Sequence, residues 1–191
     1  MISSQLLSLV AWAAYLSAGA TILTFITGIL FFTVGKPFGT INDAASVFQM
    51  LFMVPVAVAL YQILRPIATI PSVLAVTFGV TGMSDAAVLQ ALLVFRVVEY
   101  EQTIREVLIG GGLVGIWLAL VGALALVGGV LPAGLAWLGI VAGMGYLLLV
   151  AGFWLGGEGH PLFLAGSLVA VIGYSVWAIW LGRVFSLGVG N

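Results

Sequence analysis

Residues 107–157 form a run of 51 residues without a charged side chain. As one straight helix this run would be about 75 Å long, whereas the hydrocarbon core of a membrane is about 30 Å thick. The run must therefore turn back on itself. The pair Gly128-Gly129 followed by Pro132 is the expected place, because glycine ends helices and proline tolerates a helix start. Two membrane-spanning helices are predicted here, over residues 107–127 and 132–155.

The rest of the chain shows the same character, with 63% hydrophobic and 6% charged residues overall. A soluble domain is about a quarter charged, so lipid is the expected solvent. The first apolar run has no basic residues before it and is too long for a secretory signal, which predicts a membrane helix instead. The alternation of a β-barrel is absent. The sequence predicts an all-α polytopic membrane protein, a single bundle of six transmembrane helices over residues 6–34, 44–64, 71–95, 107–127, 132–155 and 161–181.

Six spans place both chain ends on one side of the membrane. That side holds Arg65 and Arg183, whereas the other holds three cations and five carboxylates, a net charge of +2 against −2. The counts of Lys and Arg alone, two against three, barely separate the sides. We expect a multi-pass plasma-membrane protein with both termini in the cytoplasm. Five dispersed Lys and Arg residues exclude a nucleic-acid partner.

Asp85 is the one carboxylate well inside a predicted span. A charge at that depth is costly, so such a residue is a functional candidate by default. Thr77, Thr81 and Ser84 lie at helical spacing from it and extend it into a polar stripe. Two interpretations remain open: a proton- or cation-linked transport site facing the bundle interior, or a neutral acid that donates a hydrogen bond to a neighbouring helix.

The remaining polar segments lie between the spans. Thr40 and Asp43 have the spacing of a capping box at the start of the second span, and a ligand site that includes Lys36 and Asn42 is the alternative. The charged segment 96–106 is expected to be a hydrated loop, with possible pairs between Arg96 and Glu99 and between Glu101 and Arg105.

Nothing in the sequence indicates catalysis. The chain has no Cys and a single His, His160, which cannot by itself build a closed metal site. Neither Ser167 nor Ser175 has the surroundings of a hydrolase nucleophile. We therefore expect no enzymatic activity, no metal and no cofactor.

Small and aromatic residues suggest how the helices pack. The spacings Gly111/Gly115, Gly139/Gly143 and Gly152/Gly156 let helix backbones approach closely, either within the bundle or at an interface with a second copy or a larger membrane complex. Most tryptophans fall near span ends, where indoles favour the membrane interface. These are Trp12, Trp137, Trp154, Trp177 and Trp180, whereas Trp117 lies deeper and is expected to pack between helices.

Three segments, GKPFGTINDAASV, LPAGLAWLGIVAGMGYLLL and GYSVWAIWLGR, carry a resemblance to a known group. They resemble uncharacterised multi-pass bacterial membrane proteins grouped as a domain of unknown function, over residues 35–64 and 131–183. The resemblance implies a bacterial six-helix plasma-membrane protein and supplies no catalytic residues. Asp85 is not part of the shared pattern. The expected function is that of a structural or accessory membrane subunit, with a small-solute or cation/proton-linked permease as the alternative.

Overall fold

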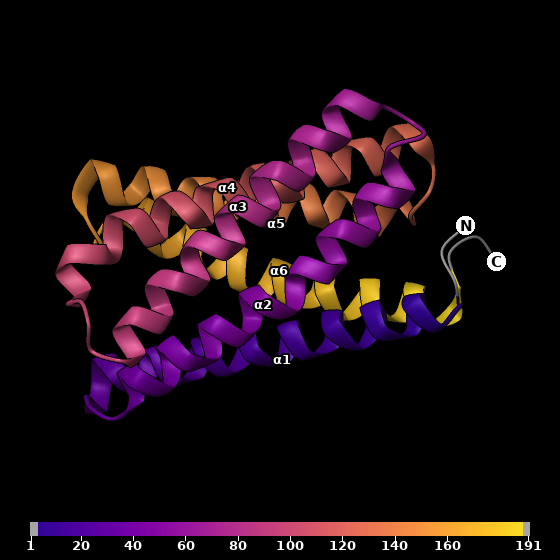
Figure 1. Ribbon diagram of the computed structural model, residues 1–191. Helices are drawn as coiled ribbons and strands as arrows, with labels where there is room; N and C mark the ends of the chain where they lie inside the picture. Colours follow the sequence, from indigo (N-terminus) through magenta and orange to yellow (C-terminus); the bar gives the residue numbers. More distant parts are fainter. Residues whose placement is uncertain (1–3, 189–191) are drawn as a thin grey trace.

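The structure, a computed structural model, describes residues 4–188 and is built from long helices (Figure 1). Within this range there are six, all of them long and apolar enough to cross a membrane. Their bounds are α1 Ser4–Val34, α2 Phe38–Leu64, α3 Thr69–Val94, α4 Tyr100–Gly128, α5 Ala133–Gly156 and α6 Pro161–Leu187. The prediction of an all-helical membrane protein with six spans is confirmed.

Three helices extend six or seven residues beyond their predicted bounds. α2 begins at Phe38 rather than at residue 44, α4 begins at Tyr100 rather than at residue 107, and α6 continues to Leu187 rather than ending at 181. The predicted boundaries fall where the chain becomes polar, which is where a helix leaves the lipid. A helix does not have to end there, because its backbone hydrogen bonds are made within the helix on either side of the boundary.

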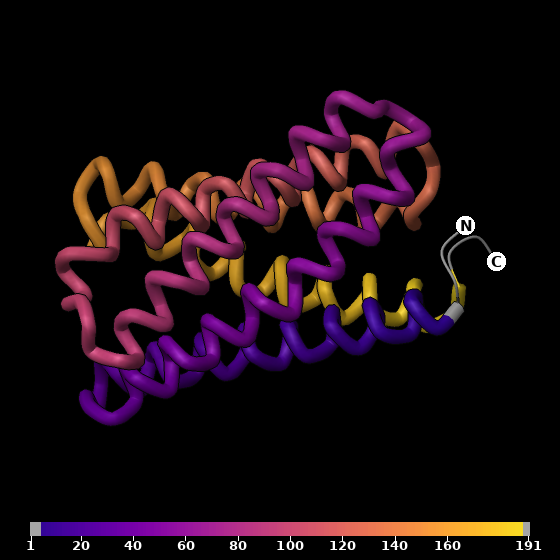
Figure 2. Tube along the Cα trace, viewed as in Figure 1, coloured from indigo at the N-terminus to yellow at the C-terminus, as the bar shows by residue number. Residues whose placement is uncertain are grey.

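The helices form a closed ring. Each helix packs against its neighbours in sequence, and α1 also packs along α6, which closes the circuit. α2 additionally touches α4 across the ring. The tube in Figure 2 shows the first turns of α1 and the last turns of α6 together at one end of the bundle. We call that end the terminal side, and we call the opposite end, with connections 35–37, 95–99 and 157–160, the three-loop side.

Large side chains fill the centre of the ring. Trp117 of α4 and Trp177 of α6 are both fully buried and meet edge to face, with ring centroids 5.7 Å apart. Each indole lies on a glycine of the preceding helix, Trp117 on Gly79 and Trp177 on Gly139, where a Cβ would come within 2.7 and 3.0 Å. Trp117 therefore packs between helices as predicted, whereas the interfacial position predicted for Trp177 is wrong. Trp12, Trp137, Trp154 and Trp180 are all partly or largely exposed.

Glycines set the close approach of α4 to both neighbours. A Cβ on Gly82 would lie 2.5 Å from the carbonyl oxygen of Gly110, and one on Gly143 would lie 2.5 Å from that of Gly115. Gly152 lies equally close to the backbone of α6, where a Cβ would meet the amide nitrogen of Phe163. These glycines pack helices of one chain against one another, which is the first of the two interpretations given above.

Candidate functional site

The polar stripe predicted on the third span lies on the outside of the bundle. Thr77, Thr81, Ser84 and Asp85 are all exposed. The inner face of α3 is formed instead by small or flexible residues that let α4 approach, namely Ala75, Gly79, Gly82, Met83 and Ala86. The stripe therefore does not face the bundle interior, which the transport interpretation requires. Close packing favours small side chains between helices, and the polar residues occupy the opposite face.

Asp85 lies in the outer seam between α3 and α4. One carboxylate oxygen of Asp85 is 3.2 Å from the place of a Cβ on Gly110, so the carboxylate lies against the backbone of α4. Asp85 makes no hydrogen bond or ion pair with any residue of the 4–188 range. The charge that acts on it comes from Glu106 of α4, which is a like charge. Asp85 is nine residues before the end of α3, about 13 Å along the helix, and therefore inside the apolar part of the span.

A second polar group, which sequence reasoning missed, is buried inside the ring. The hydroxyl of Ser17 in α1 donates to the carbonyl oxygen of Gln49 in α2 at 2.8 Å and lies 2.6 Å from the hydroxyl of Tyr174 in α6. The side chain of Gln49 also interacts with the hydroxyl of Tyr146 of α5. Four helices are thus joined through side chains that are almost completely buried. Isolated Ser, Gln and Tyr residues in apolar runs gave no sequence signal for this network.

The interior around this network is dry. Ser17, Trp117, Trp177 and Tyr174 have 0–1% of their surface exposed, so no water-sized space reaches them. The indole nitrogen of Trp177 is buried without a hydrogen-bond partner. Tyr146 and Tyr174 meet edge to face with ring centroids 6.3 Å apart. This part of the molecule is a packed core with polar contacts, not a chamber for a solute.

The start of α2 differs from the predicted capping box. α2 begins directly after Pro37, which supplies no side-chain cap, so Thr40 and Asp43 lie within the helix. Asn42 instead reaches α1, where its amide donates to the carbonyl oxygen of Thr24 at 2.6 Å. The predicted cap is wrong because the chain enters the helix two residues before Thr40.

The charged segment 96–106 is mostly helical and its predicted ion pairs do not form. Glu99 and Gln102 make the capping box that begins α4. Arg105 lies over the ring of Trp154 in α5, 5.7 Å from the centroid, as a cation–π contact. No ion pair joins Arg96 or Arg105 to a carboxylate of the described chain. The carboxylate of Glu99 instead accepts from the backbone at the start of α4.

Two further contacts order the three-loop side. The hydroxyl of Tyr100, at the start of α4, donates to the carboxylate of Glu158 in the α5–α6 connection. The imidazole of His160 accepts from the backbone nitrogen of Leu162 at 3.2 Å and so caps α6. His160 therefore has a structural partner within its own turn. In the described part of the chain, no three His, Asp or Glu side chains are grouped so that they could hold a metal ion.

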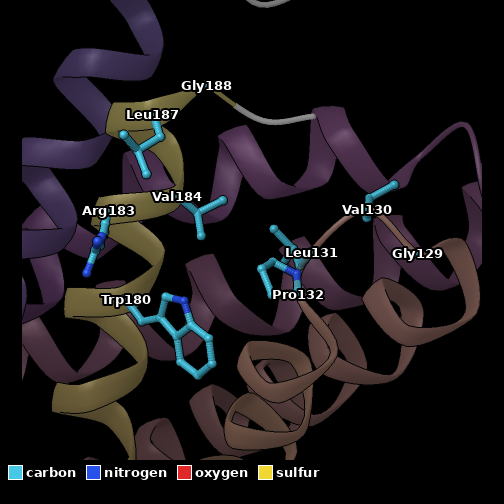
Figure 3. Close-up of a pocket in the computed structure, with 9 residues that line it drawn as sticks. All are labelled: Gly129, Val130, Leu131, Pro132, Trp180, Arg183, Val184, Leu187 and Gly188. Atoms are coloured by element: carbon cyan, nitrogen blue, oxygen red, sulfur yellow. The ribbon is translucent and has the colours of Figure 1, made fainter. Parts of the chain in front are cut away.

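Hollows in the surface lie at the two ends of the bundle. On the terminal side, a groove of about 440 Å³ separates the α4–α5 connection from the last turns of α6 (Figure 3). Figure 3 shows Val184 directed toward Leu131, whereas Arg183 points to another side of α6. Arg183 and Trp180 are residue types that favour the membrane interface, and the rest of the groove is lined by apolar side chains and backbone. On the three-loop side, a cavity of about 540 Å³ brings Lys36, Asn42 and Asp43 together with Arg96 and Glu99.

The fold defines a class of protein, a multi-pass membrane protein whose six helices close into a ring around a dry core. Comparisons of the chain with protein families, with characterised proteins and with solved structures find no match. The polar groups of the molecule lie in three places: on the outer face of α3, in the core and at the three-loop side.

Proposed function

We propose that this protein is a non-enzymatic accessory subunit of a bacterial plasma membrane, which binds another membrane protein through the outer face of α3. The observation that carries the proposal is the stripe of Thr77, Thr81, Ser84 and Asp85 on the surface that faces lipid in the isolated chain. The assignment to bacteria and to the plasma membrane rests on the sequence resemblance described above.

The polar side chains of the stripe are costly to expose to lipid and are stabilised when they contact another protein. A carboxyl within the hydrocarbon costs several kcal/mol by most measures, roughly 2.5–3.5 kcal/mol on insertion scales. Ser and Thr in membrane helices hydrogen-bond across helix interfaces when a second helix is present. Asp85 has no protein partner in the described chain to offset its cost. A helix of another protein laid along α3 supplies the missing contacts.

The chemistry of the partner follows from charge. Asp85 and Glu106 are two carboxylates on adjacent helices, so Asp85 lies near a like charge. The complementary partner helix carries Lys or Arg, or the amide of Asn or Gln, at the depth of Asp85. In a second copy of this chain the basic residues lie toward helix ends, and Arg105, which is nearest to Asp85 in depth, already lies over the ring of Trp154.

The permease is the other candidate, and the arrangement of the helices does not favour it. A carrier binds its solute in a cavity near the middle of the membrane. Here the middle of the ring is filled by Trp117, Trp177 and Tyr174. Uptake that depends on a proton gradient, measured in proteoliposomes and abolished by Asp85→Asn, would support the permease over the accessory subunit.

A photocrosslinking experiment tests the accessory role. A benzophenone amino acid is placed at Thr81 in the stripe and, as the matched control, at Ile172, which is 58% exposed on α6. In native membranes we expect an adduct with another membrane protein from position 81 and only lipid adducts from position 172. An adduct of twice the mass of this chain would overturn the heterologous partner in favour of self-association. The absence of any protein adduct at position 81 would overturn the proposal.

The proposed orientation has both termini in the cytoplasm, which places the three-loop side outside. Because the chain has no Cys, single cysteines can be introduced at Gln62 near the terminal side and at Glu101 on the three-loop side. Both positions are exposed. A membrane-impermeant maleimide added to intact cells is expected to label E101C and not Q62C, and the reverse pattern would overturn the orientation.

A further inference from the structure

The cavity on the three-loop side collects charged groups from two connections that are far apart in sequence. Lys36 belongs to the α1–α2 connection and Arg96 to the α3–α4 connection, and both line the same cavity of about 540 Å³. Asp43, in the second turn of α2, lines it too. The cavity is thus bordered by two cations and by two carboxylates, Asp43 and Glu99, and it offers opposite charges to one ligand.

These three side chains are available to a ligand. None of Lys36, Asp43 and Arg96 forms a side-chain hydrogen bond or an ion pair within the described residues. Neighbouring polar groups are already used: the amide of Asn42 bonds to α1, the carboxylate of Glu99 caps α4, and the hydroxyl of Tyr100 bonds to Glu158. The structure therefore leaves one anion and two cations of the cavity without a protein partner.

The backbone at Arg96 is held in an unusual conformation. Its φ is 56°, in the left-handed region that favours glycine. It occupies the position after the end of α3 in a Schellman motif, with Val97 N bonded to Leu92 O at 2.9 Å and Arg96 N to Leu93 O at 3.0 Å. A non-glycine residue there costs about 1 kcal/mol or more. The chain keeps an arginine where glycine is favoured, and this geometry places Arg96 at the cavity.

One wall of the cavity is apolar and faces lipid. Phe31 and Phe32 at the end of α1 are 38% and 72% exposed, and their rings meet edge to face with centroids 5.4 Å apart. Leu93 and Val98 complete this wall. A ligand of this cavity thus has a charged end beside Lys36 and Arg96 and an apolar end along the phenylalanines, which is the shape of a membrane lipid.

We infer that this cavity binds the headgroup of a lipid that carries both a phosphate and a primary ammonium, that is, a phosphoethanolamine lipid. Lys36 and Arg96 bind the phosphate, since basic pockets between membrane helices bind lipid headgroups. The carboxylate of Asp43 accepts hydrogen bonds from the ammonium. A trimethylammonium headgroup has the same charges but no N–H donor, and a glycerol headgroup has the phosphate but no cation for Asp43.

The test is lipid binding to the purified, delipidated protein in detergent, measured by native mass spectrometry with three lipids of identical acyl chains. We expect phosphatidylethanolamine to bind about tenfold more tightly than phosphatidylcholine and phosphatidylglycerol. Asp43→Asn is expected to remove this preference while leaving phosphatidylglycerol binding unchanged. The double change Lys36→Gln with Arg96→Gln is expected to weaken all three about tenfold. Glu101→Gln, an exposed charge change outside the cavity, is the matched control and is expected to alter nothing.

Two outcomes would overturn the inference. Equal binding of the three lipids, unchanged in Asp43→Asn, would remove the headgroup site. Equally tight binding of soluble glycerophosphoethanolamine would assign the cavity to a free phosphoester rather than to a lipid. Circular dichroism of each variant in the same detergent separates loss of binding from loss of fold. Neither outcome bears on the outer face of α3, so the inference is independent of the proposed function.

Discussion

Replacing Asp85 by Leu tests whether the polar stripe of α3 faces outward or inward. Two quantities are measured: the free energy of unfolding and the free energy of inserting α3 into the membrane. The structure shows no hydrogen bond or ion pair that the change would break, and the repulsion with Glu106 disappears. In a bilayer the unfolded state keeps its helices inserted, so an exposed side chain at position 85 contacts lipid in both states. We expect the free energy of unfolding to change by less than about 0.5 kcal/mol, as for ordinary surface substitutions.

The same substitution changes the free energy of inserting α3 into the membrane. Insertion scales place Asp near the middle of a span at about +2.5 to +3.5 kcal/mol and Leu at about −0.3 to −0.6 kcal/mol. Asp85 is nine residues from one end of a helix of 26 residues, so it lies within a few residues of the middle. Asp85→Leu is therefore expected to favour insertion of α3 by about 3 kcal/mol.

Two assays measure these quantities. Steric trapping in bicelles gives the free energy of unfolding of the inserted protein, and glycosylation mapping gives the insertion of α3 as a single segment. Asp85→Asn serves as the isosteric control, which removes the charge and keeps the shape. If Asp85→Leu lowers the free energy of unfolding by more than about 1 kcal/mol, Asp85 makes interactions inside the folded chain, and the outward assignment of the stripe is refuted.

Two further substitutions test the interior of the bundle. Gly82→Ala puts a methyl group 2.5 Å from the carbonyl oxygen of Gly110, so we expect the free energy of unfolding to fall by about 1–3 kcal/mol. The control is Gly19→Ala, where nothing lies within 4 Å and no loss of stability is expected. Equal effects of the two substitutions in steric trapping would contradict the close helix contact. Ser17→Ala removes a hydroxyl that bonds to α2 at 2.8 Å and contacts Tyr174 at 2.6 Å. Because an interhelical hydrogen bond in a membrane contributes roughly 0.6 kcal/mol, losing these two is expected to lower the free energy of unfolding by about 1 kcal/mol. A Ser17→Ala variant as stable as the wild type would show that these bonds do not hold the ring closed.

The number of spans and their approximate positions follow from the amino-acid sequence alone. Lipid satisfies no backbone hydrogen bond, so each apolar run of about 20 residues becomes a helix, and the uncharged run 107–157 can only be two. The same reasoning places Asp85 inside a span. These conclusions depend only on the solvent, and the structure confirms the six helices.

The direction of the polar residues was decided by tertiary packing. In a membrane helix both the lipid-facing and the inner faces are apolar, so hydrophobic periodicity does not separate them. The sequence therefore leaves the direction of Asp85 open, and the structure places it outside. Small residues identify the inner face of α3, because Gly79 and Gly82 are where α4 approaches. Trp177 was misplaced for the same reason: its position near a span end suggested the interface, but the ring buries it against Trp117.

The cavity on the three-loop side also depended on the fold. The sequence raised Lys36, Asn42 and Asp43 as a possible ligand site but gave no reason to join them to Arg96, 60 residues from Lys36. Their meeting requires α1 to α4 to stand side by side with their connections at one end of the bundle. Residue types and local spacing determine which helices form in lipid. Which side chains from different connections share one cavity is determined only when the helices pack, because that contact is made across space and not along the chain.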